Sequence, residues 1–222
     1  LKVIEMMEDA EKLDEPRRMA HRIKHIGFGW VKFGGKAMKT REGSSIFLED
    51  VIDEAVKLVR RKIEEKNPAL TEIDDTALMI GVGAVVFSQL SVRRHKDVNF
   101  DWDEVLSFEG ETGPYLQYTH ARLCSLLRNY GKTVRRDVDF SLLNCEEEHR
   151  VVELLADFPD AIRDAATNYD SYYIAAYLLR LAGAFNKVYQ RKDAQGRIDK
   201  IISENEPLSA SRMALVESVA IV

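Results

Sequence analysis

The feature that most constrains the fold is a helical pattern of apolar residues that starts at Leu48. Over the next sixteen positions these residues recur at steps of about three and four, which places them in one stripe on an α-helix. Acidic residues gather at the start of the segment and basic residues later, the order that the helix dipole favours. Asn67 and Pro68 end the helix. The stripe consists of Leu48, Val51, Ile52, Ala55, Val59 and Ile63.

The rest of the chain is also dominated by helical patterns. Only 5 prolines and 12 glycines occur among 222 residues, so long stretches are free to be helical. Three small residues, Ala77, Gly81 and Ala84, would let a neighbouring helix approach closely. We expect a first helix over 1–15 and further helices over 71–91, 112–131, 145–156, 159–168, 171–190 and 209–222.

Helix ends are marked by capping residues. Thr71 and Asp74 have the spacing of a capping box. Thr112 and Pro114 predict the start of another helix, and Gly131 predicts its end. Residues 93–102 are charged and predict an irregular connector, and Asp101 or Asp103 can cap a short turn behind it.

Before the first long stripe the composition is different. Residues 25–33 are rich in aromatic and β-branched side chains and predict a strand, and residues 44–47 predict a short second strand. The predicted fold class is therefore mainly α. A helical bundle over 69–222 follows a small α/β piece over 1–68.

Composition excludes several function classes. Hydrophobic residues are 45% and charged residues 31%, which excludes a disordered or fibrous chain. The longest apolar run is far shorter than the roughly 20 residues of a membrane helix. With 37 acidic and 32 basic residues the net charge is −5, so any RNA contact must come from a local patch. Cys124 and Cys145 are too few for a disulfide framework or a four-ligand zinc site, and we expect both to be reduced.

The sequence contains no complete catalytic motif. A G-x-S-x-G elbow, an H-E-x-x-H metal motif and a phosphate loop ending in G-K-[ST] are all missing. His21 and His25 lie four residues apart, but no carboxylate at matching spacing completes a metal site. We therefore predict neither a bound metal nor a self-contained active site.

The glycine-flanked loop over 34–43 is the first candidate site. Its cations, its threonine hydroxyl and its apolar anchor are a set that suits polyphosphate oxygens. A charged hairpin tip is the alternative interpretation. The candidate residues are Lys36, Met38, Lys39, Thr40 and Arg41.

The segment over 109–123 is the second candidate. Tyr115, Tyr118 and Arg122 share one helix face, while a leucine face rotated from it can enter the core. Two exposed tyrosines beside an arginine suit stacking of unpaired bases. Packing of both rings against a neighbouring helix is the alternative.

Together these motifs resemble the C-terminal half of the arginyl-tRNA synthetases, which are class I aminoacyl-tRNA ligases. The resemblance rests on H-I-G-F-G at 25–29, M-K-T-R-E-G at 38–43, F-L-E-D-V-I-D-E-A at 47–55, F-D-W-D-E-V-L-S-F-E-G at 100–110 and T-G-P-Y-L-Q-Y-T-H-A-R-L at 112–123. It covers almost the whole chain, and the ordered set of motifs is specific.

The resemblance implies an ATP-dependent parent enzyme. Such an enzyme uses ATP, with Mg²⁺, and arginine to form arginyl-adenylate, and then transfers arginine to tRNA(Arg). The loop over 38–43 falls where the family has its second signature, K-M-S-K-S. Here Ala37 stands where the first lysine is usual and Lys39 where the serine is usual. The family's Rossmann domain with its H-I-G-H signature is missing, so we expect a fragment that is truncated at both ends, holds no cofactor and is inactive alone.

The helical part resembles the anticodon-binding domain of this family. Tyr115 and Tyr118 match the tyrosine pair that the family presents toward the anticodon loop. Further candidate contacts to tRNA are Arg122, Arg128, Lys132, Arg135 and Arg136. The resemblance implies a cytoplasmic partner of tRNA that engages neither DNA nor a membrane. A free-standing tRNA-binding module without catalysis is the alternative function, and a plain helical interaction domain is a third.

Overall fold

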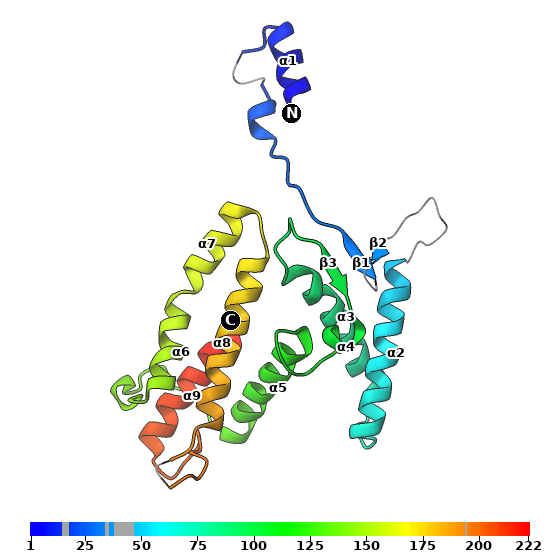
Figure 1. Ribbon diagram of the computed structural model, residues 1–222. Helices are drawn as coiled ribbons and strands as arrows, with labels where there is room; N and C mark the ends of the chain where they lie inside the picture. The colour runs from blue at the N-terminus through cyan, green and yellow to red at the C-terminus, as the bar shows by residue number, and fades with distance from the viewer. Residues whose placement is uncertain (15–17, 34–35, 38–46, 194) are drawn as a thin grey trace.

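The structure is a computed structural model that describes residues 1–14, 18–33, 36–37, 47–193 and 195–222. Helices dominate these ranges, as Figure 1 shows, which confirms the mainly α fold class. The helices are α1 (Lys2–Ala10), α2 (Leu48–Lys66), α3 (Ile73–Leu90), α4 (Trp102–Val105), α5 (Gly113–Tyr130), α6 (Glu146–Ala156), α7 (Phe158–Asn168), α8 (Tyr172–Gln190) and α9 (Glu206–Ile221), with 3₁₀ turns η2 (Ala20–Arg22) and η4 (Phe140–Leu142).

A small sheet carries the order β2-β1-β3. Strand β1 (Val31–Phe33) pairs antiparallel with β2 (Lys36–Ala37) and parallel with β3 (Val98–Phe100), in a register that sets Phe33 opposite Phe100. The irregular connector expected over 93–102 is confirmed for residues 93–97 and wrong for residues 98–100, which form β3. The predicted strand over 25–33 is confirmed only for its last three residues. Of the strand predicted over 44–47, residues 44–46 lie outside the described ranges.

Residues 94–97 form hydrogen bonds with residues 29–30, which lead into strand β1. The Gly29 amide donates to the Arg94 carbonyl at 2.7 Å, and the Trp30 amide donates to Asp97 Oδ1 at 2.9 Å. Asp97 also pairs with Lys32 at 2.7 Å, and this hydrogen bond is the main reason that the pKa of Asp97 is lowered. A Cβ atom at residue 29 would lie 2.0 Å from the Lys96 carbonyl oxygen, so only glycine permits this close approach.

The first hydrophobic core, which we call the α2–α3 core, joins α2, α3, α4 and β3. The apolar stripe predicted from Leu48 onward packs into it through Val51, Ala55 and Val59, each 6% exposed or less. Phe100 stacks on Phe33 with 4.8 Å between the ring centroids, which attaches the sheet to this core. The three small residues predicted to allow close approach, Ala77, Gly81 and Ala84, are all buried.

The second hydrophobic core, which we call the α5–α9 core, joins α5, α6, α8 and α9. Tyr177, Phe185 and Met213 are among its most deeply buried side chains. The N-terminus of α5 is capped as predicted, because Thr112 accepts a hydrogen bond from the Tyr115 amide, and Gly131 ends this helix in the left-handed conformation. The capping box predicted at Thr71 is wrong, since α3 begins after Glu72 without a side-chain cap.

Helix α3 belongs to the α2–α3 core and contacts both α2 and α5. Among the described residues it is the one helix that is long and apolar enough, by length and composition, to cross a membrane. Ala77, Gly81, Ala84 and Val85 are buried in its contacts. Packing against its neighbours does not cover the whole helix, because Leu78, Met79, Val86 and Leu90 are 45–63% exposed.

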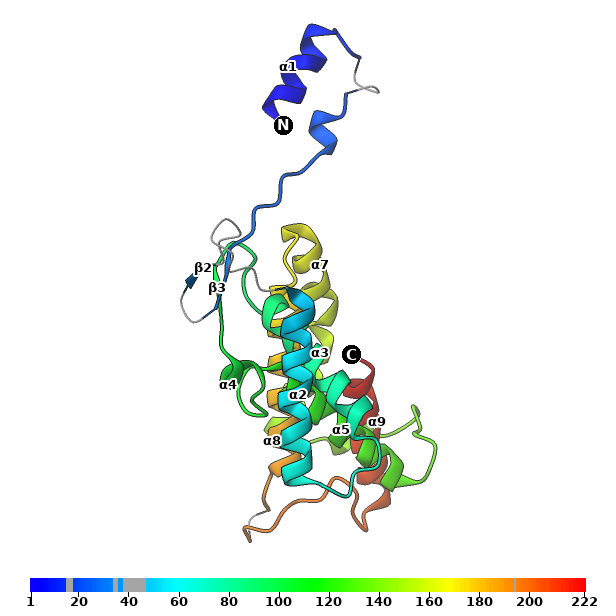
Figure 2. The same cartoon turned by 90° about the vertical axis from the view of Figure 1, so that its right-hand side faces the viewer.

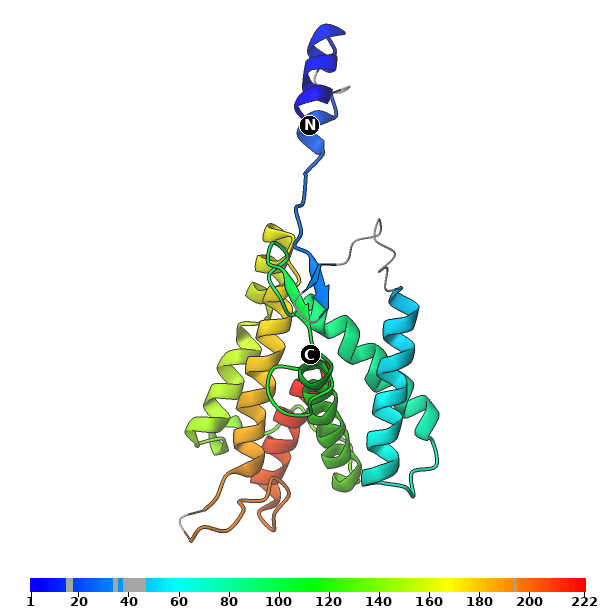
Figure 3. The ribbon, with the colours of Figure 1, turned by 45° about the vertical axis from the view of Figure 1, so that its right-hand side comes forward.

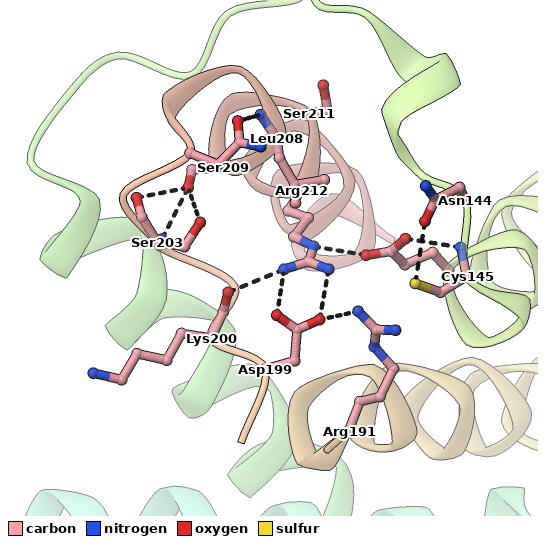
Figure 4. A network of polar contacts seen from close by, with 12 residues as sticks. Asn144, Cys145, Arg191, Asp199, Lys200, Ser203, Leu208, Ser209, Ser211 and Arg212 are labelled. Atoms are coloured by element: carbon pink, nitrogen blue, oxygen red, sulfur yellow. Dashed lines mark hydrogen bonds and ion pairs between the residues drawn. The ribbon is translucent and has the colours of Figure 1, made fainter. Parts of the chain in front are cut away.

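A buried ionic network holds α9 in the second core, as Figure 4 shows. Arg212 is 4% exposed and donates to Glu148 Oε1 of α6 at 2.7 Å. It also makes two hydrogen bonds to Asp199, at 2.8 and 3.1 Å, and one to the Lys200 carbonyl. Glu148 Oε2 in turn accepts from the Cys145 amide, and burial is the main reason that the pKa of the Cys145 thiol is raised. One guanidinium therefore joins α9, α6 and the 199–200 segment.

The N-terminal part of the chain stands apart from both cores. Figures 1 and 2 show α1 and η2 at the end of an extended segment that leads to β1. Glu8 is 5% exposed and accepts hydrogen bonds from the Met19 and Ala20 amides, so α1 and η2 hold each other. Phe28 and Trp30 in the extended segment are 86% and 70% exposed.

Candidate nucleic-acid interface

An open cleft of about 910 Å³ lies where the C-terminal half of α2, the first half of α5 and the second half of α8 converge. We call it the α2–α5–α8 cleft. Figure 3 shows α5 between α8 and α2. The cleft is lined by Val59, Lys62, Ile63, Lys66, Asn67, Leu70, Phe108, Glu109, Gly110, Tyr115, Tyr118, Arg122, Gly183, Asn186, Lys187 and Gln190.

Three of the predicted tRNA-binding residues meet in this cleft. The Thr112 cap and Pro114 fix where α5 begins, and therefore which face carries Tyr115, Tyr118 and Arg122. Tyr118 is 53% exposed, whereas Tyr115 is half-buried with its hydroxyl bonded to α8. The ring of Tyr118 is therefore exposed, as the base-stacking interpretation requires. The ring of Tyr115 is partly covered by its packing against α8.

Arg122 lies close to two tyrosine rings. Its guanidinium carbon lies 4.8 Å from the centroid of Tyr118 and 4.3 Å from that of Tyr189 on α8. Arg122 Nη1 also donates to Asn186 Oδ1. Arg122 therefore lies within cation–π distance of one ring on α5 and one ring on α8.

The sequence interpretation missed Asn186 and Tyr189. Both lie on α8, more than 60 positions after the tyrosine face of α5. Their role depends on the contact between α5 and α8, and the sequence carries no local signal for that contact. Helical spacing places Asn186 and Tyr189 on one side of α8, but it does not show which helix they face.

The lining of the cleft is basic although the whole chain is acidic. Four basic residues line it, namely Lys62, Lys66, Arg122 and Lys187. Glu109 is the one acidic residue among its described lining residues. Lys62 Nζ donates to the Leu106 carbonyl at 3.2 Å, which holds this ammonium at the cleft wall. A chain with a net charge of −5 thus carries a local cationic patch beside the exposed ring of Tyr118.

The other predicted tRNA contacts lie at the opposite end of α5. Arg128, Lys132, Arg135 and Arg136 are exposed, and none of them lines the cleft. Lys132 pairs with Glu206, and this hydrogen bond raises the pKa of Lys132. Arg135 pairs with Asp137 and, by its hydrogen bond, lowers the pKa of that carboxyl. The structure does not bring these cations together with the tyrosines, and their contact with tRNA stays a prediction.

The predicted phosphate loop lies largely outside the described residues. Lys36 lies in β2 opposite Phe33, and positions 38–41, which hold Met38, Lys39, Thr40 and Arg41, are not described. The role of this loop in binding ATP therefore stays a prediction.

Within the described ranges, no group of three or more histidine, cysteine or acidic side chains comes together to hold a metal ion.

Comparisons with known families divide the chain into two matched segments. Residues 116–222 match the DALR anticodon binding domain, and residues 10–102 match the catalytic domain of the class I tRNA synthetases of the arginine type. The first match contains Tyr118, Arg122, Asn186 and Tyr189. The second contains α2, whose lysines line the opposite wall of the cleft.

Curated relatives extend over most of the chain. An arginine–tRNA ligase of Ligilactobacillus salivarius is 43% identical over 198 residues, which cover 89% of this chain and 34% of the relative. An arginine–tRNA ligase of Clostridium botulinum is 40% identical over 195 residues, which cover 88% of this chain and 33% of the relative. The chain therefore spans about a third of the length of these relatives.

Solved structures agree with the sequence comparisons. Arginyl-tRNA synthetase of Thermus thermophilus superposes with a TM-score of 0.80 at 32% identity, over 88% of this chain and 32% of that structure. Arginyl-tRNA synthetase of Plasmodium falciparum superposes with a TM-score of 0.75 over 99% of this chain and 35% of that structure, and its 20% identity supports the fold alone.

Proposed function

We propose that this chain, which matches the C-terminal part of the arginyl-tRNA synthetases, binds the anticodon loop of tRNA(Arg) in the α2–α5–α8 cleft. The observation that carries the proposal is the combination of an exposed tyrosine ring with four cationic side chains in one cleft of an acidic chain. Anticodon loops present unstacked bases next to closely spaced phosphates, so they require both features.

The chemistry of the cleft suits a single-stranded loop. Tyr118 offers a ring on which a base can stack, and such a stack contributes about 1–3 kcal/mol. Lys62, Lys66 and Lys187 supply ammonium groups for phosphate oxygens. If three or four phosphates are neutralised, the logarithm of the binding constant should fall against the logarithm of salt concentration with a slope of about −2 to −3.

We further propose that the whole protein is an arginine–tRNA ligase. It would attach arginine to tRNA(Arg) in the cytoplasm, using ATP through arginyl-adenylate, and the loop over 38–43 would contact the ATP phosphates. The matched catalytic domain and the named ligases support this proposal. A free-standing tRNA-binding module is not favoured, because residues 10–102 match a catalytic domain.

The binding proposal is tested with the 222-residue chain and a labelled anticodon stem–loop of tRNA(Arg). Tyr118→Ala should weaken binding by roughly 5- to 150-fold, because it removes the stacking surface. Phe140→Ala is the matched control, since Phe140 is 54% exposed but lies in η4, outside the cleft. Its affinity should stay within about twofold of the wild type.

A second pair of variants fills the cleft without removing any polar group. A Cβ atom at Gly183 would lie 4.0 Å from the Tyr115 hydroxyl, an ordinary contact distance, so Gly183→Ala should still bind the stem–loop. The longer side chain of Gly183→Met would occupy the space in front of Tyr115 and should weaken binding at least tenfold. Unchanged affinity in both Tyr118→Ala and Gly183→Met would refute the assignment of RNA to this cleft.

A further inference from the structure

The amide of Asn186 joins the polar groups of the cleft wall. Asn186 is half-buried on α8 and faces α5. Its Nδ2 donates to the Tyr115 hydroxyl at 2.9 Å and to Thr119 Oγ1 at 3.0 Å. Its Oδ1 accepts from Arg122 Nη1. One side chain of α8 therefore bonds three side chains of α5.

The orientation of this amide is determined by its neighbours. A guanidinium has N–H donors and no acceptor, so the atom that faces Arg122 must be Oδ1. The Thr119 hydroxyl donates to the Tyr115 carbonyl at 3.0 Å, and it must therefore accept from Nδ2. A flipped amide would set a donor against a donor at Arg122 and would leave the Thr119 hydroxyl without a donor. Both neighbours require the same orientation.

This orientation also determines what Tyr115 can do. Since the Tyr115 oxygen accepts from Asn186, its own proton points elsewhere, and no described residue accepts it. The Nε and Nη2 groups of Arg122 likewise have no hydrogen-bond acceptor among the described residues. Both residues line the cleft, one on each side of the Asn186 amide. This part of the wall therefore presents hydrogen-bond donors.

We propose that Asn186 is a positioning residue that sets the Tyr115 hydroxyl as a donor, holds the Arg122 guanidinium beside it, and so makes the cleft select a base edge with neighbouring acceptors. The inference rests on the proposed function. A ring nitrogen beside a carbonyl oxygen is such an edge, and an amino group at the same place would oppose the donors of the cleft. Asn186 acts through its two partners and need not touch the RNA.

The test compares the effect of removing the Tyr115 hydroxyl in two backgrounds. Tyr115→Phe should weaken stem–loop binding by roughly 5- to 10-fold in the wild-type chain, because one hydrogen bond to the base is lost. Asn186→Asp has nearly the same shape, but its carboxylate only accepts, so the Tyr115 proton turns back toward it. Tyr115→Phe should then have no further effect on affinity. This ratio is insensitive to the added negative charge, because both members of the second pair carry it.

Asn168→Asp supplies the matched control background. Asn168 is exposed at the end of α7, outside the cleft, and in that background Tyr115→Phe should retain its full effect. If Asn186→Asp does not fold, Asn186→Leu replaces it. Loss of the amide then leaves the hydroxyl unoriented, so the Tyr115→Phe effect should fall to less than half of its wild-type factor.

The outcomes separate the two proposals. If the wild-type chain does not bind the stem–loop, the proposed function fails. If Tyr118→Ala weakens binding but Tyr115→Phe has equal effects in the wild-type and Asn186→Asp chains, the cleft binds RNA and the positioning role of Asn186 is wrong. A Tyr115→Phe variant with wild-type affinity would also overturn that role.

Discussion

At the scale of single residues, Arg212 shows how much depends on burial. Its removal in Arg212→Met would leave Glu148, which is fully buried, without its cationic partner. An uncompensated buried charge typically lowers the free energy of unfolding by about 3–5 kcal/mol, and urea denaturation should show a loss of this size. Lys132→Met is the control, because Lys132 pairs with Glu206 on the same helix α9 but both side chains are exposed. It should leave the urea midpoint nearly unchanged.

Asp97 gives a prediction for the dependence on pH. The pKa of Asp97 is lowered mainly by its hydrogen bond with Lys32, and next by the Trp30 amide. A carboxyl with a lowered pKa in the folded state stabilises the protein above its unfolded pKa of about 4, and this contribution is lost as the pH falls through the folded pKa. Asp97→Asn should therefore be less stable than the wild type at pH 7. The two unfolding free energies should approach each other as the pH falls below the unfolded pKa of about 4, and a difference that stayed constant there would contradict this.

The residues of the site differ in how well the sequence could predict them. Tyr115, Tyr118 and Arg122 follow from the repeat of a single helix, and the structure places all three in one cleft. Among the cations at the far end of α5, Arg135 has its partner Asp137 two positions on in the sequence, whereas the partner of Lys132 becomes visible only in the fold. Glu206, for example, lies 74 positions after Lys132. Asn186 was missed for the same reason.

At the scale of elements, the long helices were predictable because local signals agreed. Periodicity, the Thr112 cap and the Gly131 terminator all indicated α5. Strand β3 was missed because it is three residues long and its partner β1 lies 67 positions earlier in the chain. Parallel pairing between such short segments leaves no repeat in the sequence. The resemblance to the arginyl-tRNA synthetases is confirmed by the comparisons, whereas the division at residues 68 and 69 stays a prediction.

The same glycine-to-alanine substitution should have opposite effects on stability at two positions, Gly81 in α3 and Gly183 in α8. A Cβ atom at Gly81 would lie 3.0 Å from the Val56 backbone nitrogen, so Gly81→Ala must push the helices apart. We expect it to lower the free energy of unfolding by about 1–3 kcal/mol. Gly183→Ala meets only an ordinary contact and should raise that free energy by about 0.5–1 kcal/mol, because alanine favours the helix. Thermal and urea unfolding of the two variants would show whether the signs differ.

At the scale of the whole molecule, the cleft joins two hydrophobic cores. Val59 and Lys62 belong to the α2–α3 side, whereas Tyr118, Arg122 and Asn186 belong to the α5–α9 side. A ligand that contacts both walls stabilises the arrangement in which both cores are folded. Because the free chain has two separate cores and no ligand that joins them, its calorimetric unfolding should show a broad or double transition. A saturating anticodon stem–loop should raise the midpoint and sharpen the transition, whereas a stem–loop that shifted only one of two peaks would contradict binding across both cores.

The extended segment that leads from η2 to the sheet has a consequence for digestion by proteases. Residues 23–27 belong to no helix or strand, and Arg22 and Lys24 are basic residues exposed at their start. Trypsin requires an accessible, extended stretch beside a basic residue, and this segment supplies both. Brief digestion should therefore cut first near residues 22–24 and release α1 with η2. The remaining fragment should retain every residue that lines the α2–α5–α8 cleft.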